Sequence, residues 1–255
     1  MGRTLEIRGV KIGDGIPKII VPIVGTTREE ILAAAASFAG VRLDMVEWRA
    51  DWFENVFDFP KIVEVLTDLR AELGETPILF TFRTSREGGQ KAIDIKDYAD
   101  LNVRTAQTGL VDLIDVEAFT GDEIVREIID GAHAAGVKII ASNHDFEKTP
   151  GKDEIVRRLR RMQELGADIP KIAVMPQSRE DVLTLLSATL EMTRKFADRP
   201  VITMSMTGTG LISRLCGEIF GSACTFGAVG KASAPGQMNA SDLSAILELI
   251  HEAMR

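Results

Sequence analysis

The chain has few cysteines and no long apolar run, and each shortage excludes a class of protein. Its two cysteines, Cys216 and Cys224, lie in apolar stretches without metal-ligand spacing, which favours a reducing compartment. The first residues contain no apolar core of signal-peptide length, and no apolar run reaches the length of a membrane span. We therefore expect a cytoplasmic protein that does not enter a membrane.

Basic residues are fewer than acidic residues in this chain. The chain carries 30 Lys and Arg against 38 Asp and Glu, which gives a formal net charge of -8. This balance argues against nonspecific binding to nucleic acid or to an anionic membrane. It does not exclude a small anionic substrate, because the local field in a cleft need not follow the total charge.

The common cofactor and nucleophile motifs are missing. No two histidines have the spacing of a metal site, so we expect no metal. The segment 208–210 lacks the third glycine of a dinucleotide fingerprint, and the segment 225–232 lacks the leading glycine and final hydroxyl of a phosphate-binding loop. No Gly-x-Ser-x-Gly elbow is found. We expect no bound cofactor.

What the sequence does contain is a regular alternation of apolar strands and helices. Strands are expected at 19–24, 45–51, 78–83, 113–118, 138–145, 169–176, 201–207 and 223–229. Helices are expected at 27–38, 60–73, 95–107, 122–135, 152–165, 179–196, 212–220 and 241–254. Such a repeat predicts an α/β fold, a (β/α)8 barrel in one domain spanning residues 1–255. A doubly wound open sheet is disfavoured because no Gly-rich fingerprint follows the first strand.

Two local signals accompany this pattern. Residues 4–19 predict a polar N-terminal β-hairpin whose turn is Gly13-Asp14-Gly15. The segment Thr27-Arg28-Glu29-Glu30 predicts a capping box at the start of the first helix.

One lysine stands in an apolar context. Lys171 lies in the segment 169–176 (IPKIAVMP), which predicts a short buried strand. Burying an ammonium is costly, and the neutral amine, which is a nucleophile, would be cheaper to bury. Two other arrangements remain open: Lys171 reaches solvent from a strand end, or it pairs with a carboxylate.

Polar residues share one face of several expected strands, since residues two apart point the same way. These residues are Glu47, Arg49 and Asp51; Thr81 and Arg83, with Glu87 just beyond; Asp115 and Glu117; and Ser142 and His144. Most lie at the C-terminal ends of their strands, where barrel enzymes build their sites, whereas Lys171 lies early in its strand. Each residue alone has a structural explanation, such as an ion pair between Glu47 and Arg49. Burying all of them together without a function would be costly, so we expect an active site.

Six blocks of sequence occur in an order and spacing that characterise one family. They are Glu47-Trp48-Arg49-Ala50-Asp51, Phe80-Thr81-Phe82-Arg83 with Glu87-Gly88-Gly89, Ser142-Asn143-His144-Asp145, Pro170-Lys171, Ser213-Arg214 and Ser233-Ala234-Pro235-Gly236-Gln237. In this combination the chain resembles the type I 3-dehydroquinate dehydratases over nearly its whole length. The resemblance implies a homodimeric (β/α)8 barrel that converts the small anion 3-dehydroquinate to 3-dehydroshikimate and water without a metal or cofactor.

The resemblance also implies roles for individual residues. Lys171 resembles the residue that forms an imine with the substrate ketone, His144 the residue that transfers protons, and Glu87 the acid that orients the histidine. An imine accepts developing negative charge better than a ketone, so a weak base such as imidazole suffices for the proton step.

The remaining matched residues resemble substrate ligands. Arg214 looks like the ligand of the substrate carboxylate. The others resemble ligands of substrate oxygens, namely Glu47, Arg49 and Arg83, or members of a loop that closes over the site, namely Ser233 and Gln237. We expect Arg49, Arg83 and Arg214 to make the site locally positive.

Two alternatives fit parts of the pattern. Another imine-forming barrel, such as an aldolase for sugar acids, would share Lys171 but need a base placed for carbon–carbon cleavage. A non-catalytic barrel that binds a small anion would bind ligand without forming an imine.

Overall fold

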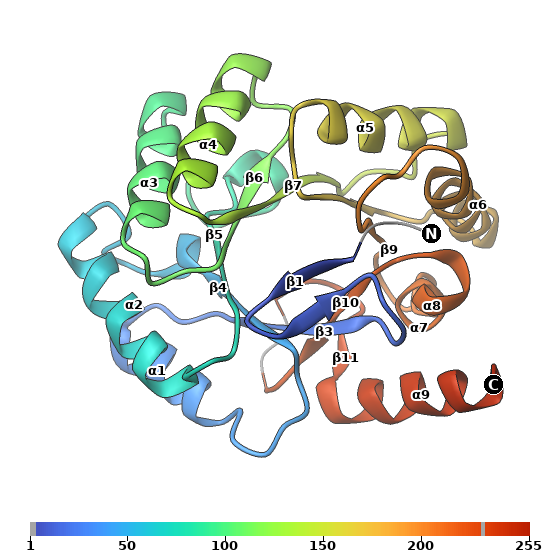
Figure 1. Cartoon of the computed structure of the whole chain (residues 1–255), viewed down its shortest axis with the longest axis horizontal. Helices are drawn as coiled ribbons and strands as arrows, with labels where there is room; N and C mark the ends of the chain where they lie inside the picture. The colour runs from blue at the N-terminus through green and yellow to red at the C-terminus, as the bar shows by residue number, and fades with distance from the viewer. Residues whose placement is uncertain (1–3, 231–232) are drawn as a thin grey trace.

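The apolar segments become parallel strands of one sheet in the computed structural model, which describes residues 4–230 and 233–255 (Figure 1). Neighbouring strands follow the order β10-β3-β4-β5-β6-β7-β8-β9, and the short β11 lies beside β10. The strands are β3 (Lys18–Ile23), β4 (Met45–Arg49), β5 (Ile78–Thr81), β6 (Leu113–Glu117), β7 (Lys138–Asp145), β8 (Ile169–Val174), β9 (Ile202–Ser205), β10 (Cys224–Ala228) and β11 (Met238–Asn239).

The ring of strands closes between β9 and β10. Val201 and Ser222 form a parallel bridge there, and the Ala223 N–H donates to the Val201 carbonyl at 2.8 Å. The Ser222 hydroxyl accepts from the Thr203 N–H at 3.0 Å, so a side chain takes the place of a ladder carbonyl at the seam. The prediction of a (β/α)8 barrel is confirmed.

Helices surround the ring on its outside (Figure 1). They are α1 (Arg28–Ala36), α2 (Phe59–Leu73), α3 (Ile95–Gln107), α4 (Asp122–Ala134), α5 (Lys152–Glu164), α6 (Arg179–Lys195), α7 (Ile212–Leu215), α8 (Gly217–Phe220) and α9 (Ala240–Ala253), with 3₁₀ turns η1 (Ala50–Trp52) and η2 (Ser85–Glu87). The helix expected at 212–220 is in fact two one-turn helices, because the backbone leaves helical geometry at Cys216.

The start of α1 differs in detail from the expected capping box. The Thr27 hydroxyl accepts from the Glu30 N–H at 3.3 Å, as predicted. The Glu30 carboxylate, however, accepts from the N–H of Thr26 at 2.7 Å. The glutamate side chain of this motif therefore binds the residue before the N-cap, Thr26, and not the N-cap Thr27 itself.

The interior of the barrel is apolar at the N-terminal end of the strands. One buried cluster combines inward side chains of the strands with the hairpin residues Ile7 and Ile12. Its strand members include Ile20, Met45, Leu79, Leu113, Ile140, Ile169, Ile202 and Cys224. A second and larger cluster, which includes Trp48 and Phe80, lies between the sheet and the helices. The barrel thus has a packed floor and a packed wall.

The N-terminal hairpin covers this floor and differs from the prediction. Strands β1 (Leu5–Ile7) and β2 (Val10–Ile12) are joined by Arg8 and Gly9, both with positive φ, in a two-residue turn. The expected turn at 13–15 is wrong; that segment only connects the hairpin to β3. The hairpin is not simply polar either, because Ile7 and Ile12 are buried against the floor. Figure 1 shows β1 lying across the end of the barrel.

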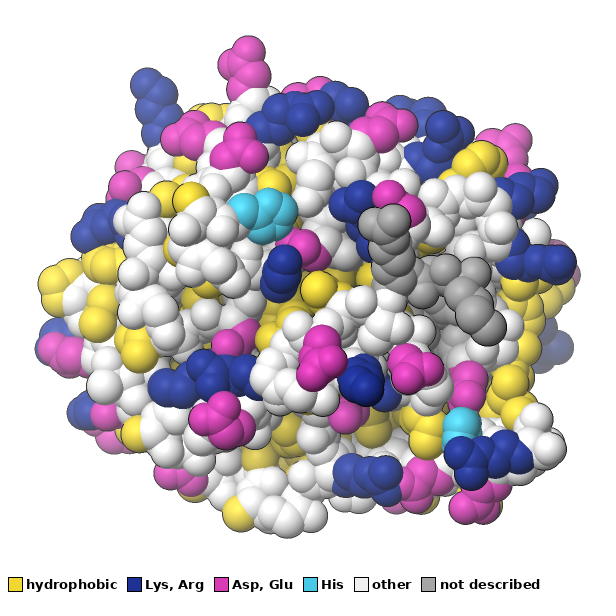
Figure 2. All heavy atoms as spheres, viewed as in Figure 1, with side chains coloured by type: hydrophobic (Ala, Val, Ile, Leu, Met, Phe, Trp, Pro, Cys, Tyr) yellow, Lys and Arg dark blue, Asp and Glu magenta, His cyan; other side chains and the backbone are white. Residues whose placement is uncertain are grey.

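Charged side chains of both signs are interspersed over the face shown in Figure 2, which is viewed from the same side as Figure 1. Many form surface ion pairs, such as Arg8 with Glu75 at 2.8 Å. Within residues 4–230 and 233–255, no helix is both long and apolar enough to span a bilayer.

We predict that Ile12→Ala will destabilise the protein by about 2–5 kcal/mol, because it removes a fully buried side chain from the barrel floor. The free energy of unfolding in denaturant measures this. Lys11→Ala, at the exposed neighbouring position, should change stability by no more than about 0.5 kcal/mol. Equal effects of the two substitutions would show that the hairpin does not contribute to the core.

Candidate active site

Above the apolar floor, the inward positions of five adjacent strands are polar. The first such positions are Glu47 on β4, Thr81 on β5, Asp115 on β6, Ser142 on β7 and Lys171 on β8, and all five residues are buried. The next positions along four of these strands, or just past their ends, carry Arg49, Arg83, Glu117 and His144. The change from apolar to polar thus occurs within two residues on each strand.

These side chains surround a cavity of about 180 Å³. A cavity of this size suits one small molecule. All nine site residues expected from the sequence line it: Glu47, Arg49, Arg83, Glu87, His144, Lys171, Arg214, Ser233 and Gln237. The early position of Lys171 in its strand does not exclude it from the site, because its side chain extends along the barrel interior.

Lys171 forms an ion pair in the barrel interior. Its Nζ donates to Asp115 Oδ2 at 3.0 Å and lies 4.7 Å from the centroid of the Phe226 ring. Both charged residues are buried, with Asp115 completely inaccessible. Of the arrangements left open by the sequence, pairing with a carboxylate is the one observed. The pair offsets part of the cost of burying each charge.

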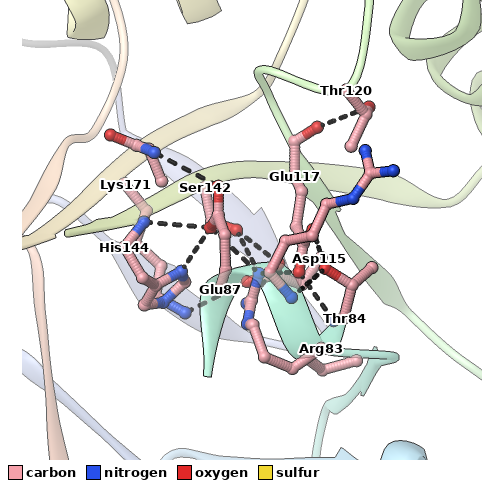
Figure 3. Close-up of polar contacts among 12 residues, drawn as sticks. Arg83, Thr84, Glu87, Asp115, Glu117, Thr120, Ser142, His144 and Lys171 are labelled. Atoms are coloured by element: carbon pink, nitrogen blue, oxygen red, sulfur yellow. Dashed lines mark hydrogen bonds and ion pairs between the residues drawn. The ribbon is translucent and has the colours of Figure 1, made fainter. Parts of the chain in front are cut away.

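Arg83 connects this pair to a larger buried network (Figure 3). Its Nη2 donates to Asp115 Oδ1 at 2.6 Å, and its Nη1 donates to Glu117 Oε1 at 3.2 Å and to the Ser142 hydroxyl at 3.0 Å. The Ser142 hydroxyl in turn donates to Asp115 Oδ1 at 2.6 Å. Asp115 therefore has one oxygen held by Arg83 and Ser142 and the other directed at Lys171. Burial alone would raise the pKa of Asp115, but the charges of Arg83 and Lys171 hold it below its usual range.

His144 is held by Glu87, which follows β5. Glu87 Oε2 lies 2.9 Å from His144 Nδ1 and accepts from the His144 backbone N–H at 2.9 Å. The loop returns Glu87 to the cavity through a tight turn, in which a side chain at Gly89 would collide with the Arg83 carbonyl. The Glu87-Gly88-Gly89 motif therefore has a steric cause as well as a chemical one.

The environment shifts the pKa values of Glu87 and His144 in opposite directions. Burial, with a smaller contribution from Glu117, raises the pKa of Glu87 to about 7, against the opposing effect of Arg83. Burial together with the charges of Arg83 and Lys171 lowers the pKa of His144 well below its ordinary value. A neutral imidazole that shares its Nδ1 proton with Glu87 leaves Nε2 free to accept a proton.

Arg214, on α7, is the one site arginine without a carboxylate partner within residues 4–230 and 233–255. Arg49 is bound by Asp51 through two bonds of 2.8 and 2.9 Å, and Arg83 by Asp115 and Glu117. The expectation of a positive site from all three arginines is therefore wrong for these two. Arg214 is 2% exposed, its Nε has no partner in the part of the chain that the structure describes, and burial lowers its pKa to about 10. An unpaired buried guanidinium is a site for an anion.

The segment 233–237 covers one side of the cavity. The Ser233 N–H and the Gln237 side-chain oxygen bond at 2.9 Å, and the Gln237 amide donates to the Ser233 hydroxyl at 3.1 Å. Arg214 Nη2 donates to the Pro235 carbonyl at 3.2 Å, and the Thr207 N–H donates to it at 3.3 Å. The loop is therefore tied to the same guanidinium that faces the cavity.

Two residues to which the sequence assigns no role make contacts with the predicted site residues. Strand alternation predicts an inward face for Asp115, but nothing in the sequence indicates that it reaches Lys171 across an intervening strand. Asn143 donates to Glu87 Oε1 at 3.2 Å, although the strand alternation places it on the opposite face from His144. Within the described part of the chain, no group of acidic, histidine or cysteine side chains is arranged to hold a metal ion.

Barrel enzymes place their active sites at the C-terminal ends of their strands, and this chain is built as one of them. A model of the type I 3-dehydroquinase family matches residues 19–254. A 3-dehydroquinate dehydratase of Clostridioides difficile is 54% identical over 254 residues, covering 100% of both chains. The chain belongs to the type I 3-dehydroquinase family.

Solved structures agree with this assignment. A type I 3-dehydroquinate dehydratase from Clostridium difficile, crystallised with covalently modified comenic acid, has a TM-score of 0.97 at 55% identity and covers 99% of this chain and 100% of its own. The enzyme from Geobacillus kaustophilus has a TM-score of 0.96 at 37% identity, covering 99% of this chain and 98% of its own. Family membership decides against the aldolase and the non-catalytic barrel.

We predict that Glu87→Gln will move the acid limb of the kcat/KM profile to lower pH. In the wild type the raised pKa of Glu87 makes the Glu87–His144 pair take up a proton near pH 7, which removes the free base. An amide cannot take this proton, and the remaining imidazole has a lowered pKa. We expect kcat to fall roughly 10- to 100-fold, because the imidazole loses the carboxylate that orients it.

The control is Glu72→Gln, at an exposed position on α2, which should leave the profile unchanged. An acid limb at the same pH in the Glu87 variant would mean that a group other than the Glu87–His144 pair takes up the proton in this limb.

Proposed function

We propose that the chain dehydrates 3-dehydroquinate to 3-dehydroshikimate in aromatic biosynthesis, through an imine on Lys171. Family membership supports the reaction. The observation that supports the mechanism is a buried amine in a small cavity that also contains an oriented imidazole and an unpaired guanidinium. Such an amine activates a ketone by covalent catalysis.

In the first step His144 takes a proton from the Lys171 ammonium, and the neutral amine adds to the ketone carbon. The ketone oxygen leaves as water after it receives this proton back from the imidazolium and a second proton from the nitrogen. The nitrogen keeps its last proton, so a protonated imine remains. The Asp115 carboxylate, 3.0 Å from Nζ in the free enzyme, stays beside this positive charge. It cannot easily take the proton itself, since Arg83 and Lys171 keep its pKa low. Asp115 thus favours the protonated imine, which is the better electron acceptor.

In the second step His144 Nε2 removes a proton from the carbon next to the imine carbon. The electron pair moves toward the imine nitrogen and gives an enamine. The enamine then expels the hydroxyl group from the following carbon, and the imidazolium donates its proton so that water leaves. Glu87 stabilises the imidazolium formed between these events. Hydrolysis of the conjugated imine releases 3-dehydroshikimate and restores Lys171.

The remaining cavity residues bind and enclose the substrate in this proposal. Arg214 binds the substrate carboxylate, because among the described residues its buried charge has no carboxylate partner. Glu47 accepts from the Thr81 hydroxyl at 2.9 Å and retains oxygen lone pairs for substrate hydroxyls. Arg49, Arg83, Ser233 and Gln237 contact other substrate oxygens. The homodimer and the cytoplasmic location remain predictions, and sedimentation of the purified chain tests the first.

Borohydride added with 3-dehydroquinate should attach the ligand irreversibly to Lys171, because it reduces an imine to a stable amine. Intact mass and peptide mapping measure the label. Lys171→Ala should lose both the label and turnover, while ligand binding remains measurable. A label on any other lysine, including Lys231, which lies outside the described residues, would contradict the proposal.

Arg214→Gln should raise KM about 10- to 100-fold, because a bond between charged partners contributes about 1.5–3 kcal/mol. The amide keeps a donor but loses the charge. Steady-state kinetics measure the change, with Arg179→Gln on the exposed start of α6 as the control. Unchanged KM in the Arg214 variant would place the carboxylate elsewhere.

A further inference from the structure

We propose that Arg158, on α5 and outside the cavity, is a positioning residue that selects the tautomer of His144 through Asn143 and Glu87. The inference rests on the proposed function, because it concerns the base of that reaction. It assigns a role in catalysis to a residue that does not line the cavity.

A continuous series of hydrogen bonds joins these four residues. Arg158 Nη1 donates to Asn143 Oδ1 at 2.9 Å, and Asn143 Nδ2 donates to Glu87 Oε1 at 3.2 Å. The other oxygen of Glu87 lies 2.9 Å from His144 Nδ1. The series runs from the outer helix, through the outward face of β7, to the imidazole on its inward face.

The donor and acceptor roles along this series are determined by chemistry. A guanidinium has only donors, so the Asn143 side chain must present its carbonyl oxygen to Arg158. Its NH₂ group must then face Glu87, which accepts at Oε1. With Oε2 accepting from the His144 backbone N–H as well, the ionised carboxylate accepts at both oxygens. The imidazole therefore carries its proton on Nδ1, and Nε2 has the lone pair that the reaction needs.

Asn143 is the contact that orients Glu87 Oε1. Within the described residues, no other side chain donates to this oxygen. Arg83 lies 3.7 Å from Oε2, the oxygen already shared by the two groups of His144. The charges that act on the Glu87–His144 pair from other strands are Arg49, Arg83, Asp115, Glu117 and Lys171. None of these charges determines which way the Asn143 amide points.

Arg158 is held firmly enough to act in this way. Its Nε donates to Glu154 Oε1 at 2.7 Å, and its guanidinium lies 3.9 Å from Asp145 Oδ2. The side chain is 21% exposed and lies near the Phe119 ring. The neighbouring Arg157 binds the same Glu154 carboxylate at 2.7 and 2.8 Å but is 66% exposed, and it forms no bond to Asn143. Arg157 is therefore a matched control.

The test compares Arg158→Gln with Arg157→Gln in the full chain. Without Arg158 the Asn143 amide is free to turn its oxygen toward Glu87, which then holds its proton more tightly. We expect kcat to fall roughly 10- to 100-fold and the acid limb to move upward by about one pH unit. Arg157→Gln should lose the ion pair with Glu154 but keep the kcat of the wild type and the position of its acid limb. Equal profiles for the two variants would overturn the proposal.

Two further measurements separate positioning from mere structural support. Asn143→Asp keeps the acceptor for Arg158 but cannot donate to Glu87, so its acid limb should also move upward. A limb at the wild-type position in this variant would count against the inference. The ¹⁵N shifts of the imidazole, assigned with a His144→Gln variant, should show a proton on Nδ1 in the wild type and more Nε2–H in Arg158→Gln. An unchanged tautomer would overturn the proposal.

The outcomes also distinguish this inference from the proposed function. If the wild type neither turns over 3-dehydroquinate nor becomes labelled on Lys171, the proposed function fails. If the wild type does both and Arg158→Gln behaves as Arg157→Gln does, only the role of Arg158 fails.

Discussion

The ion pair between Lys171 and Asp115 is the contact on which the rest of the site depends. A lysine inside a barrel needs a partner, and Asp115 supplies it at 3.0 Å. That carboxylate is itself completely buried, so it needs Arg83 and Ser142, and Arg83 in turn needs Glu117. The Lys171 amine is therefore one member of a network in which each charge lies beside a charge of the opposite sign. Removing any one member would cost its neighbours one of their partners.

The network can occupy the barrel interior because the inward side chains differ between the two ends of the barrel. At the N-terminal end, the inward side chains are apolar, and Ile7 and Ile12 of the hairpin complete their packing. This floor contributes stability and excludes water from below. The polar residues begin directly above it, so the amine of Lys171 lies between an apolar floor and a small cavity. Stability and chemistry are thus separated along the barrel axis.

Arg214 differs from Arg49, Arg83 and Lys171 because no carboxylate among the described residues compensates its charge. Arg49 and Arg83 have carboxylate partners, so their charges are largely neutralised before any ligand arrives. Arg214 is buried, and among residues 4–230 and 233–255 its Nε has no partner and its other nitrogens bond only to the Met204 sulfur and the Pro235 carbonyl. An anionic ligand would relieve this deficit. In the proposed function, this deficit is what draws the substrate carboxylate to Arg214.

Periodicity and motif order in the sequence determined the barrel, the strand faces and the residues around the cavity. These properties depend on neighbours along the chain: alternation places Arg49 and Glu47 on one face whatever the distant contacts are. Where contacts between residues distant in the sequence determine the local structure, the sequence predicts that structure less well. Burial of Ile7 and Ile12 against eight strands places the hairpin turn at Arg8 and Gly9, and local turn propensity alone had favoured 13–15.

Only the tertiary structure decided which charges meet. Lys171 and Asp115 are 56 positions apart, on strands separated by β7, and their contact depends on strand tilt and side-chain length. The same holds for Arg158, whose helix brings it to Asn143 and so to Glu87. Residue types and faces can be read from the sequence because they are local properties. Partners cannot, because a charge is compensated by whatever the closed barrel brings within about 3 Å of it.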